Sequence, residues 1–66
     1  MSGAFFMLLP GGMRVRLSAI AAYRYNEEKA ETRIWLLGDV SPVTVPKNIV
    51  ARLDRLLGAE SLERIE

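Results

Sequence analysis

Residues 20–37 read IAAYRYNEEKAETRIWLL, and this stretch decides the fold that we predict. Two runs rich in apolar side chains flank a polar segment, a pattern typical of two strands joined by the loop of a β-hairpin. Closing the hairpin symmetrically places Tyr23 opposite Ile34 on one face. The other face then pairs Arg24 with Arg33, and like charges in this position are unfavourable unless an anion or an acidic side chain lies between them.

The same register assigns every other side chain of the hairpin to a face. The remaining pairs are Tyr25–Thr32 and Ala21–Leu36 on the first face, and Ala22–Trp35 and Ile20–Leu37 on the second. A slip of one residue would exchange the two faces of a whole strand, so the register is a specific prediction.

The chain before the hairpin also alternates, since residues 13–17 place apolar and polar side chains in turn. Period two indicates a half-buried strand. Strict alternation through to residue 25 would give a strand longer than strands usually are. We therefore predict a bend or bulge at Ser18-Ala19, which separates a strand at 13–17 from a strand at 20–25.

The chain after the hairpin predicts one more strand and one helix. Gly38-Asp39 marks a turn, residues 43–45 (VTV) form a short strand, and Pro46 suits the first turn of a helix. Apolar residues at helical spacing then form a single stripe, made of Ile49, Val50, Leu53, Leu56 and Leu57. Gly58 is placed to end this helix in a left-handed conformation.

These elements together predict an α+β fold. A small antiparallel sheet of three or four strands is covered on one face by a single C-terminal amphipathic helix. We divide the chain into an apolar N-terminal segment, residues 1–12, and one small domain, residues 13–66. The segment is either an interface strand or a flexible leader. We expect it to supply an interface and not core, with Phe5, Phe6 and Leu8 as candidates for self-association.

Composition limits the chemistry of the chain. It has 66 residues and a formal net charge of +1. Because it contains no Cys and no His, it lacks the residues that usually form disulfides, bind zinc and act as a general base. We expect no enzyme, no cofactor and no metal site. A chain this short buries only about 60% of its unfolded surface, and a second copy is the remaining source of stability. We therefore expect a homo-oligomer.

The N-terminal apolar run predicts neither a membrane span nor a secretory signal. The run ends at Leu9, far short of the about 20 residues that a spanning helix needs. A secretory signal would carry a basic residue ahead of its apolar stretch, and here Arg14 follows it. We expect a cytoplasmic protein with no membrane contact.

A candidate interaction face follows from the alternation of the strands. The side chains that point away from the predicted core are Arg14, Arg16, Arg24, Arg33, Trp35 and Leu37. Arginine mixed with aromatic and apolar residues is typical of protein interfaces. The same mixture can stack bases and neutralise phosphates, although a net charge of +1 is low for that role.

The sequence thus favours a small non-enzymatic binding module that self-associates through its sheet and its N-terminal apolar segment, with any other protein partner unidentified. The alternative is a small nucleic-acid-binding regulator that uses the arginine and tryptophan face. The order of elements from Leu17 to Leu57 resembles small bacterial regulatory domains of the LytTR type, in hydrophobic pattern and without a specific motif. This resemblance implies DNA binding.

Overall fold

The computed structural model describes residues 5–59, 62–63 and 65. The elements are β1 (Phe6–Leu8), β2 (Arg14–Arg16), a 3-10 turn (Leu17–Ala19), β3 (Ile20–Asn26), β4 (Glu31–Leu36), β5 (Val43–Val45) and α1 (Val50–Leu56). Antiparallel strands followed by one helix confirm the α+β class. With seven residues, α1 is too short to cross a bilayer, and the described part of the chain holds no longer helix.

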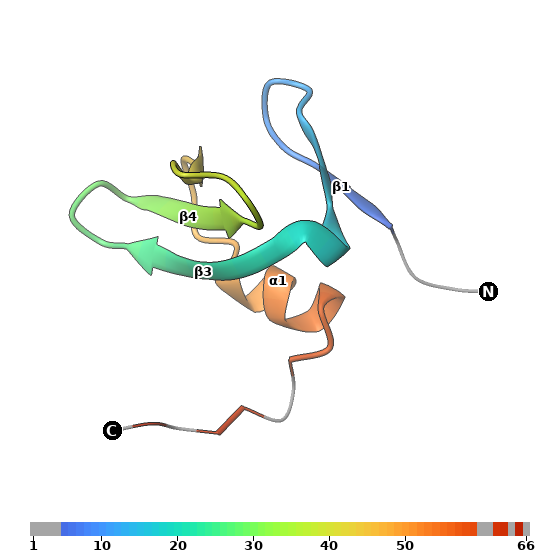
Figure 1. Cartoon of the computed structure of the whole chain (residues 1–66). Coiled ribbons are helices and arrows are strands. Elements are labelled where there is room, and N and C mark those ends of the chain that lie inside the picture. Colours follow the sequence, from blue (N-terminus) through green and yellow to red (C-terminus); the bar gives the residue numbers. More distant parts are fainter. Residues whose placement is uncertain (1–4, 60–61, 64, 66) are drawn as a thin grey trace.

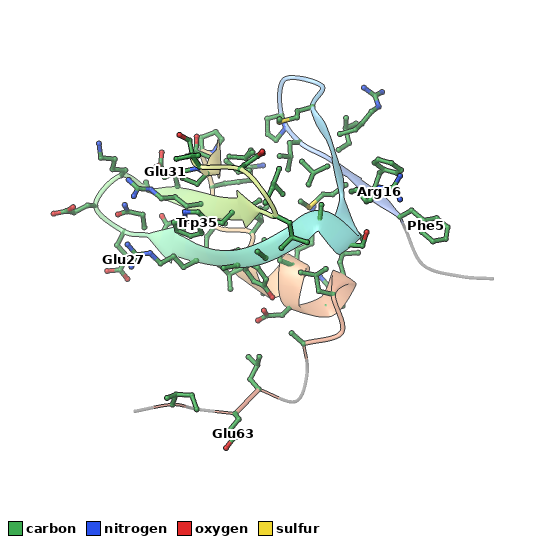
Figure 2. All side chains as sticks on the ribbon, in the orientation of Figure 1. Phe5, Arg16, Glu27, Glu31, Trp35 and Glu63 are labelled. Carbon is green, nitrogen blue, oxygen red and sulfur yellow. The ribbon has the colours of Figure 1, made fainter. Side chains whose placement is uncertain are left out.

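The strands form two sheets, which corrects the prediction of one. β1 pairs with β2, and the order β3-β4-β5 makes the second sheet (Figure 1). The 3-10 turn lies between β2 and β3, where the bend at Ser18-Ala19 was predicted. Because the chain changes direction there, β2 does not continue into the sheet of β3. Figure 2 shows Phe5 and Arg16 at one end of the molecule, and Glu27 and Glu31 at the other end, at the tip of the β3–β4 hairpin.

The predicted register of the β3–β4 hairpin is confirmed along most of its length. Tyr23 lies opposite Ile34, and Arg24 lies opposite Arg33. The register shifts between Ile20 and Ala22, so that Ile20 pairs with Leu36 and not with Leu37. This irregularity turns Ile20 toward the core, against the prediction that it shares the face of Arg24.

The core joins both sheets and the helix. Its buried apolar side chains are Met7, Leu9, Val15, Leu17, Ile34, Val45 and Leu53. Met7 and Leu9 are only 8% and 5% exposed, so the expectation that residues 1–12 supply no core is wrong. The physical reason is the alternation of β1, which turns Met7 inward while its neighbours Phe6 and Leu8 point outward.

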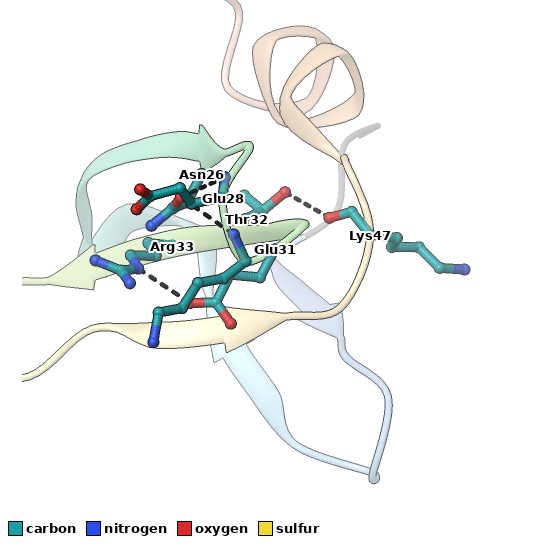
Figure 3. A network of polar contacts seen from close by, with 7 residues as sticks. Asn26, Glu28, Glu31, Thr32, Arg33 and Lys47 are labelled. Carbon is teal, nitrogen blue, oxygen red and sulfur yellow. Dashed lines mark hydrogen bonds and ion pairs between the residues drawn. The ribbon is translucent and has the colours of Figure 1, made fainter.

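The helix is shorter than predicted, because a buried threonine holds the chain before it. The Thr32 hydroxyl donates to the Lys47 carbonyl oxygen at 2.6 Å (Figure 3). It also accepts the Ile49 N–H at 3.0 Å. These bonds hold residues 47–49 beside β4, and α1 begins only at Val50. Pro46 therefore lies before the helix and not in its first turn.

The helix presents most of its predicted stripe to the core. Leu53 is fully buried, as the centre of the stripe should be. Leu56 is 40% exposed, and its place in the packed stripe was predicted wrongly, because a helix of two turns covers a narrower strip of the core. Gly58 adopts φ +71°, the left-handed ending that the sequence indicated.

Candidate interaction surfaces

The structure divides the predicted interaction face between the two sheets. Arg14 and Arg16 lie on β2, whereas Arg24, Arg33 and Trp35 lie on the three-stranded sheet. Leu37 follows β4 in an exposed turn, where its N–H donates to the Ala19 carbonyl oxygen at 2.8 Å. The expectation of one continuous arginine face is wrong, since only one three-stranded sheet forms and β2 is not part of it.

The first surface is the outer face of the β1–β2 hairpin, and we call it the hairpin surface. It consists of Phe6, Leu8, Arg14 and Arg16 on the two strands, together with the exposed Phe5, which directly precedes β1 and lines a depression with Arg16. Phe6 lies opposite Arg16, and Leu8 lies opposite Arg14. The structure thus brings together the three candidates for self-association and two of the candidate arginines.

Apolar area dominates the hairpin surface. Phe5 is 68% exposed, Phe6 is 50% exposed and Leu8 is 64% exposed. The Arg16 guanidinium lies 4.9 Å from the centroid of the Phe6 ring, a cation–π contact. Arg14 donates from Nη1 to the Gly12 carbonyl oxygen at 2.9 Å. Both arginines are therefore held beside the apolar side chains and leave them open to solvent.

The second surface is the outer face of the three-stranded sheet, and we call it the sheet surface. It consists of Arg24, Arg33, Trp35 and Thr44. Thr44 pairs with Arg33, which itself pairs with Arg24. Arg33 donates from Nε to Glu31 Oε2 at 3.0 Å (Figure 3), so an acidic side chain pairs with one of the two juxtaposed arginines.

A tyrosine attaches the opposite face of this sheet to the helix. The Tyr23 hydroxyl donates to Asp54 Oδ1 at 2.6 Å. Burial, then the hydrogen bond to Asp54, then the charge of that carboxylate raise the pKa of Tyr23 to about 12. The contact places α1 on the inner face and leaves the sheet surface uncovered by it. The sequence placed Tyr23 inward but could not identify Asp54 as its partner.

A third feature is a groove that the sequence analysis missed, and we call it the basic groove. Its apolar lining comes from Met7, Leu8, Leu9, Pro10, Val45 and Ile49, and its charged lining comes from Lys47 and Arg52. The volume is about 330 Å³. One wall belongs to the first hairpin and the other to the β5–α1 connection. No local pattern joins two segments so distant in the chain, so periodicity alone could not have found the groove.

Comparison with known proteins finds no matching family model, no matching curated protein and no matching solved structure. Within the residues that the structure describes, no group of three acidic side chains is arranged to hold a metal ion. The two surfaces and the groove are therefore interpreted from their own geometry.

Proposed function

We propose that this chain is a non-enzymatic binding module of the cytoplasm, which self-associates through the hairpin surface. The observation that supports this function is the exposure of Phe6 and Leu8, which alternate along the first hairpin with the buried Met7 and Leu9, together with the exposure of the preceding Phe5. A chain with so small a core gains from covering these side chains.

The composition of the hairpin surface suits contact with a second copy. Aromatic and arginine side chains are enriched in interfaces, and contiguous exposed apolar patches mark contact sites. In a two-fold arrangement the same patch serves both copies. Phe6 and Leu8 of each copy would meet at the centre, while the Arg14 and Arg16 guanidinium groups would stay hydrated at the rim.

Sedimentation equilibrium of the full chain over a range of concentrations tests this function. The average mass should rise above that of a monomer, and Phe6→Ser combined with Leu8→Ser should return it to the monomer value. Val40→Ser is the matched control, because Val40 is 96% exposed and lies outside the hairpin surface. A monomer throughout the range, or a double variant that associates like the unchanged chain, would overturn the proposal.

A second candidate function, nucleic-acid binding, is favoured by one observation on the sheet surface. Arg24 and Arg33 are juxtaposed, and Trp35 lies on the same uncovered face. Two phosphate contacts predict a log–log salt slope of about −1.4 to −1.8, depending on whether the strand is single or double. Titration with mixed-sequence DNA and RNA should quench Trp35 fluorescence, and Arg24→Ala should weaken the effect. No quenching at low salt with any of these nucleic acids would exclude this candidate.

A further inference from the structure

The outer edge of β1 carries free backbone groups. Leu9 N–H donates to the Met13 carbonyl oxygen at 2.8 Å, and Leu17 N–H donates to the Phe5 carbonyl oxygen at 2.9 Å. In an antiparallel pair the hydrogen-bonded positions alternate with positions whose groups point the other way. The N–H and C=O of Phe6 and Leu8 therefore point away from β2. Among the described strands, none pairs with that edge.

The basic groove borders this edge. Its lining includes Met7, Leu8, Leu9 and Pro10 from β1 and the turn that follows, and no residue of β2. The groove therefore lies on the side of β1 that faces away from β2. Lys47, Ile49 and Arg52 form the opposite wall. A space between an open strand edge and a second wall suits one extended segment.

Among the described residues, that wall is lined by positive side chains and by no carboxylate. Arg55 lines an adjoining depression together with Lys47 and Arg52, and neither lining contains a carboxylate. The one carboxylate of α1, Asp54, accepts the hydrogen bond of Tyr23. The ion pair found among the described residues belongs to the β4 strand. An occupant of the groove would therefore be favoured if it were anionic.

We propose that the basic groove binds an extended acidic segment of a protein partner, which adds as a strand to the free edge of β1. The main chain of the segment bonds to the N–H and C=O of Leu8, as in other cases of strand addition. Its acidic side chains meet Lys47 and Arg52, and its alternate side chains lie against Val45 and Ile49. This site shares Leu8 with the hairpin surface, but its other lining residues lie outside that surface, and the proposal does not depend on self-association.

Fluorescence anisotropy with a labelled octapeptide of alternating glutamate and valine tests the charge requirement. The peptide should bind the full chain more weakly as salt rises, and Lys47→Glu with Arg52→Glu should lower the affinity by at least ~10-fold. Arg24→Glu with Lys29→Glu makes the same change in net charge on the other hairpin and should leave the affinity within ~2-fold. Equal losses in both double variants, or equal binding of a lysine–valine peptide, would overturn the proposal.

Two N-methylated forms of the same peptide test strand addition. One carries methyl groups on the glutamate amides and the other on the valine amides, so only one form keeps the N–H groups that face β1. Binding by one form alone is the expected result; binding by both, or by neither, would overturn the strand geometry. If the unmethylated peptide fails to bind and Lys47→Glu with Arg52→Glu instead lowers the oligomeric mass, the groove belongs to a second copy and the proposal is wrong.

Discussion

The outward side chains of the β3–β4 hairpin are mostly polar or charged, as Arg24, Asn26, Glu31 and Arg33 show, whereas those of the β1–β2 hairpin include Phe6 and Leu8. Both hairpins turn their other face to the same core. The need to bury a core determines which side chains occupy the inward face of each hairpin. The residues on the outward face are not constrained in this way. The outward face is therefore where the two hairpins differ in what they can contact.

The hairpins also differ in how they are attached. Thr32 and Tyr23 bond the second hairpin to the β5–α1 connection and to α1. In the described residues, the side-chain hydrogen bond of the first hairpin, from Arg14 to Gly12, stays within the hairpin. Met7 and Leu9 instead attach it by apolar packing. Substitutions that remove a hydrogen-bonding group should therefore weaken the attachment of the second hairpin. Substitutions that leave a cavity should weaken the attachment of the first.

Truncation of core residues should give the largest loss of stability. It should also show which of the two hairpins contributes more to the stability of the core. Ile34→Ala removes a fully buried side chain at the centre of the second hairpin and should cost about 2–5 kcal/mol. Met7→Ala should cost about 2 kcal/mol, because Met7 lies at the margin of the core, where neighbours can close the cavity. Urea unfolding followed by Trp35 fluorescence measures both. Ile34→Val, at about 1 kcal/mol, remains readable if the alanine variant unfolds. Equal losses of stability in Met7→Ala and in Leu8→Ala, which truncates an exposed side chain, would show that the first hairpin does not contribute to the core.

Thr32→Val should cost about 2–3 kcal/mol, which tests the polar attachment of the second hairpin. The valine keeps the shape of the side chain but leaves the Lys47 carbonyl oxygen and the Ile49 N–H without their partner. Thr44→Val is the control on the same sheet, exposed to solvent, and should change stability by less than about 0.5 kcal/mol. Thermal unfolding compares the two, and similar melting temperatures would contradict the role given to Thr32.

The alkaline limb of the stability curve should report the Tyr23–Asp54 contact. The pKa of Tyr23 is raised in the folded protein from 10.0 to about 12, so folding favours the protonated phenol. Its contribution is complete below pH 10 and is lost as the pH rises toward 12, in total about 1–2 kcal/mol for this half-buried group. Urea midpoints between pH 9 and pH 12 measure this loss. Tyr23→Phe should remove this part of the decline, and Tyr25→Phe should retain it. An unchanged pH profile in Tyr23→Phe would contradict the assignment.

The smallest effect is expected on the outward face of the first hairpin. Arg16→Ala removes the cation from above the Phe6 ring and should cost only about 0.5 kcal/mol, because the pair is exposed. Arg14→Ala is the matched change on the same strand. Chemical unfolding at a concentration that keeps the variants monomeric measures both. A loss above about 2 kcal/mol for Arg16→Ala would mean that this face is needed for folding and is not free for contact.

Much of the second hairpin was predictable, because its register follows from local alternation about a polar loop. The pairs Tyr23–Ile34 and Arg24–Arg33 needed only the period of a strand and a symmetric closure. The turn conformation of Gly58 likewise follows from its position after a helical stripe. The shift at Ile20 was not predictable, since a bulge responds to how the strand must bend toward the core and not to its own side chains.

The sequence identified single residues of the interaction sites, but it did not predict how these residues assemble into surfaces. Exposure of Phe5, Phe6 and Leu8 follows from their excess over what one small core can bury. They lie beside Arg14 and Arg16 only because β1 pairs with β2. The basic groove needed still more, because Lys47 faces Leu8 across a space that only the folded chain creates.

By itself, the sequence determined the α+β class, the bend before the hairpin, the hairpin register and the burial of Leu53. Each of these depends on side-chain periodicity within one segment, where neighbouring residues set the geometry. The tertiary structure alone decided that the strands split into two sheets, that Thr32 delays the helix, and that Tyr23 meets Asp54. These outcomes join segments that are distant in the chain, and they are selected by which arrangement buries apolar area while satisfying every buried polar group.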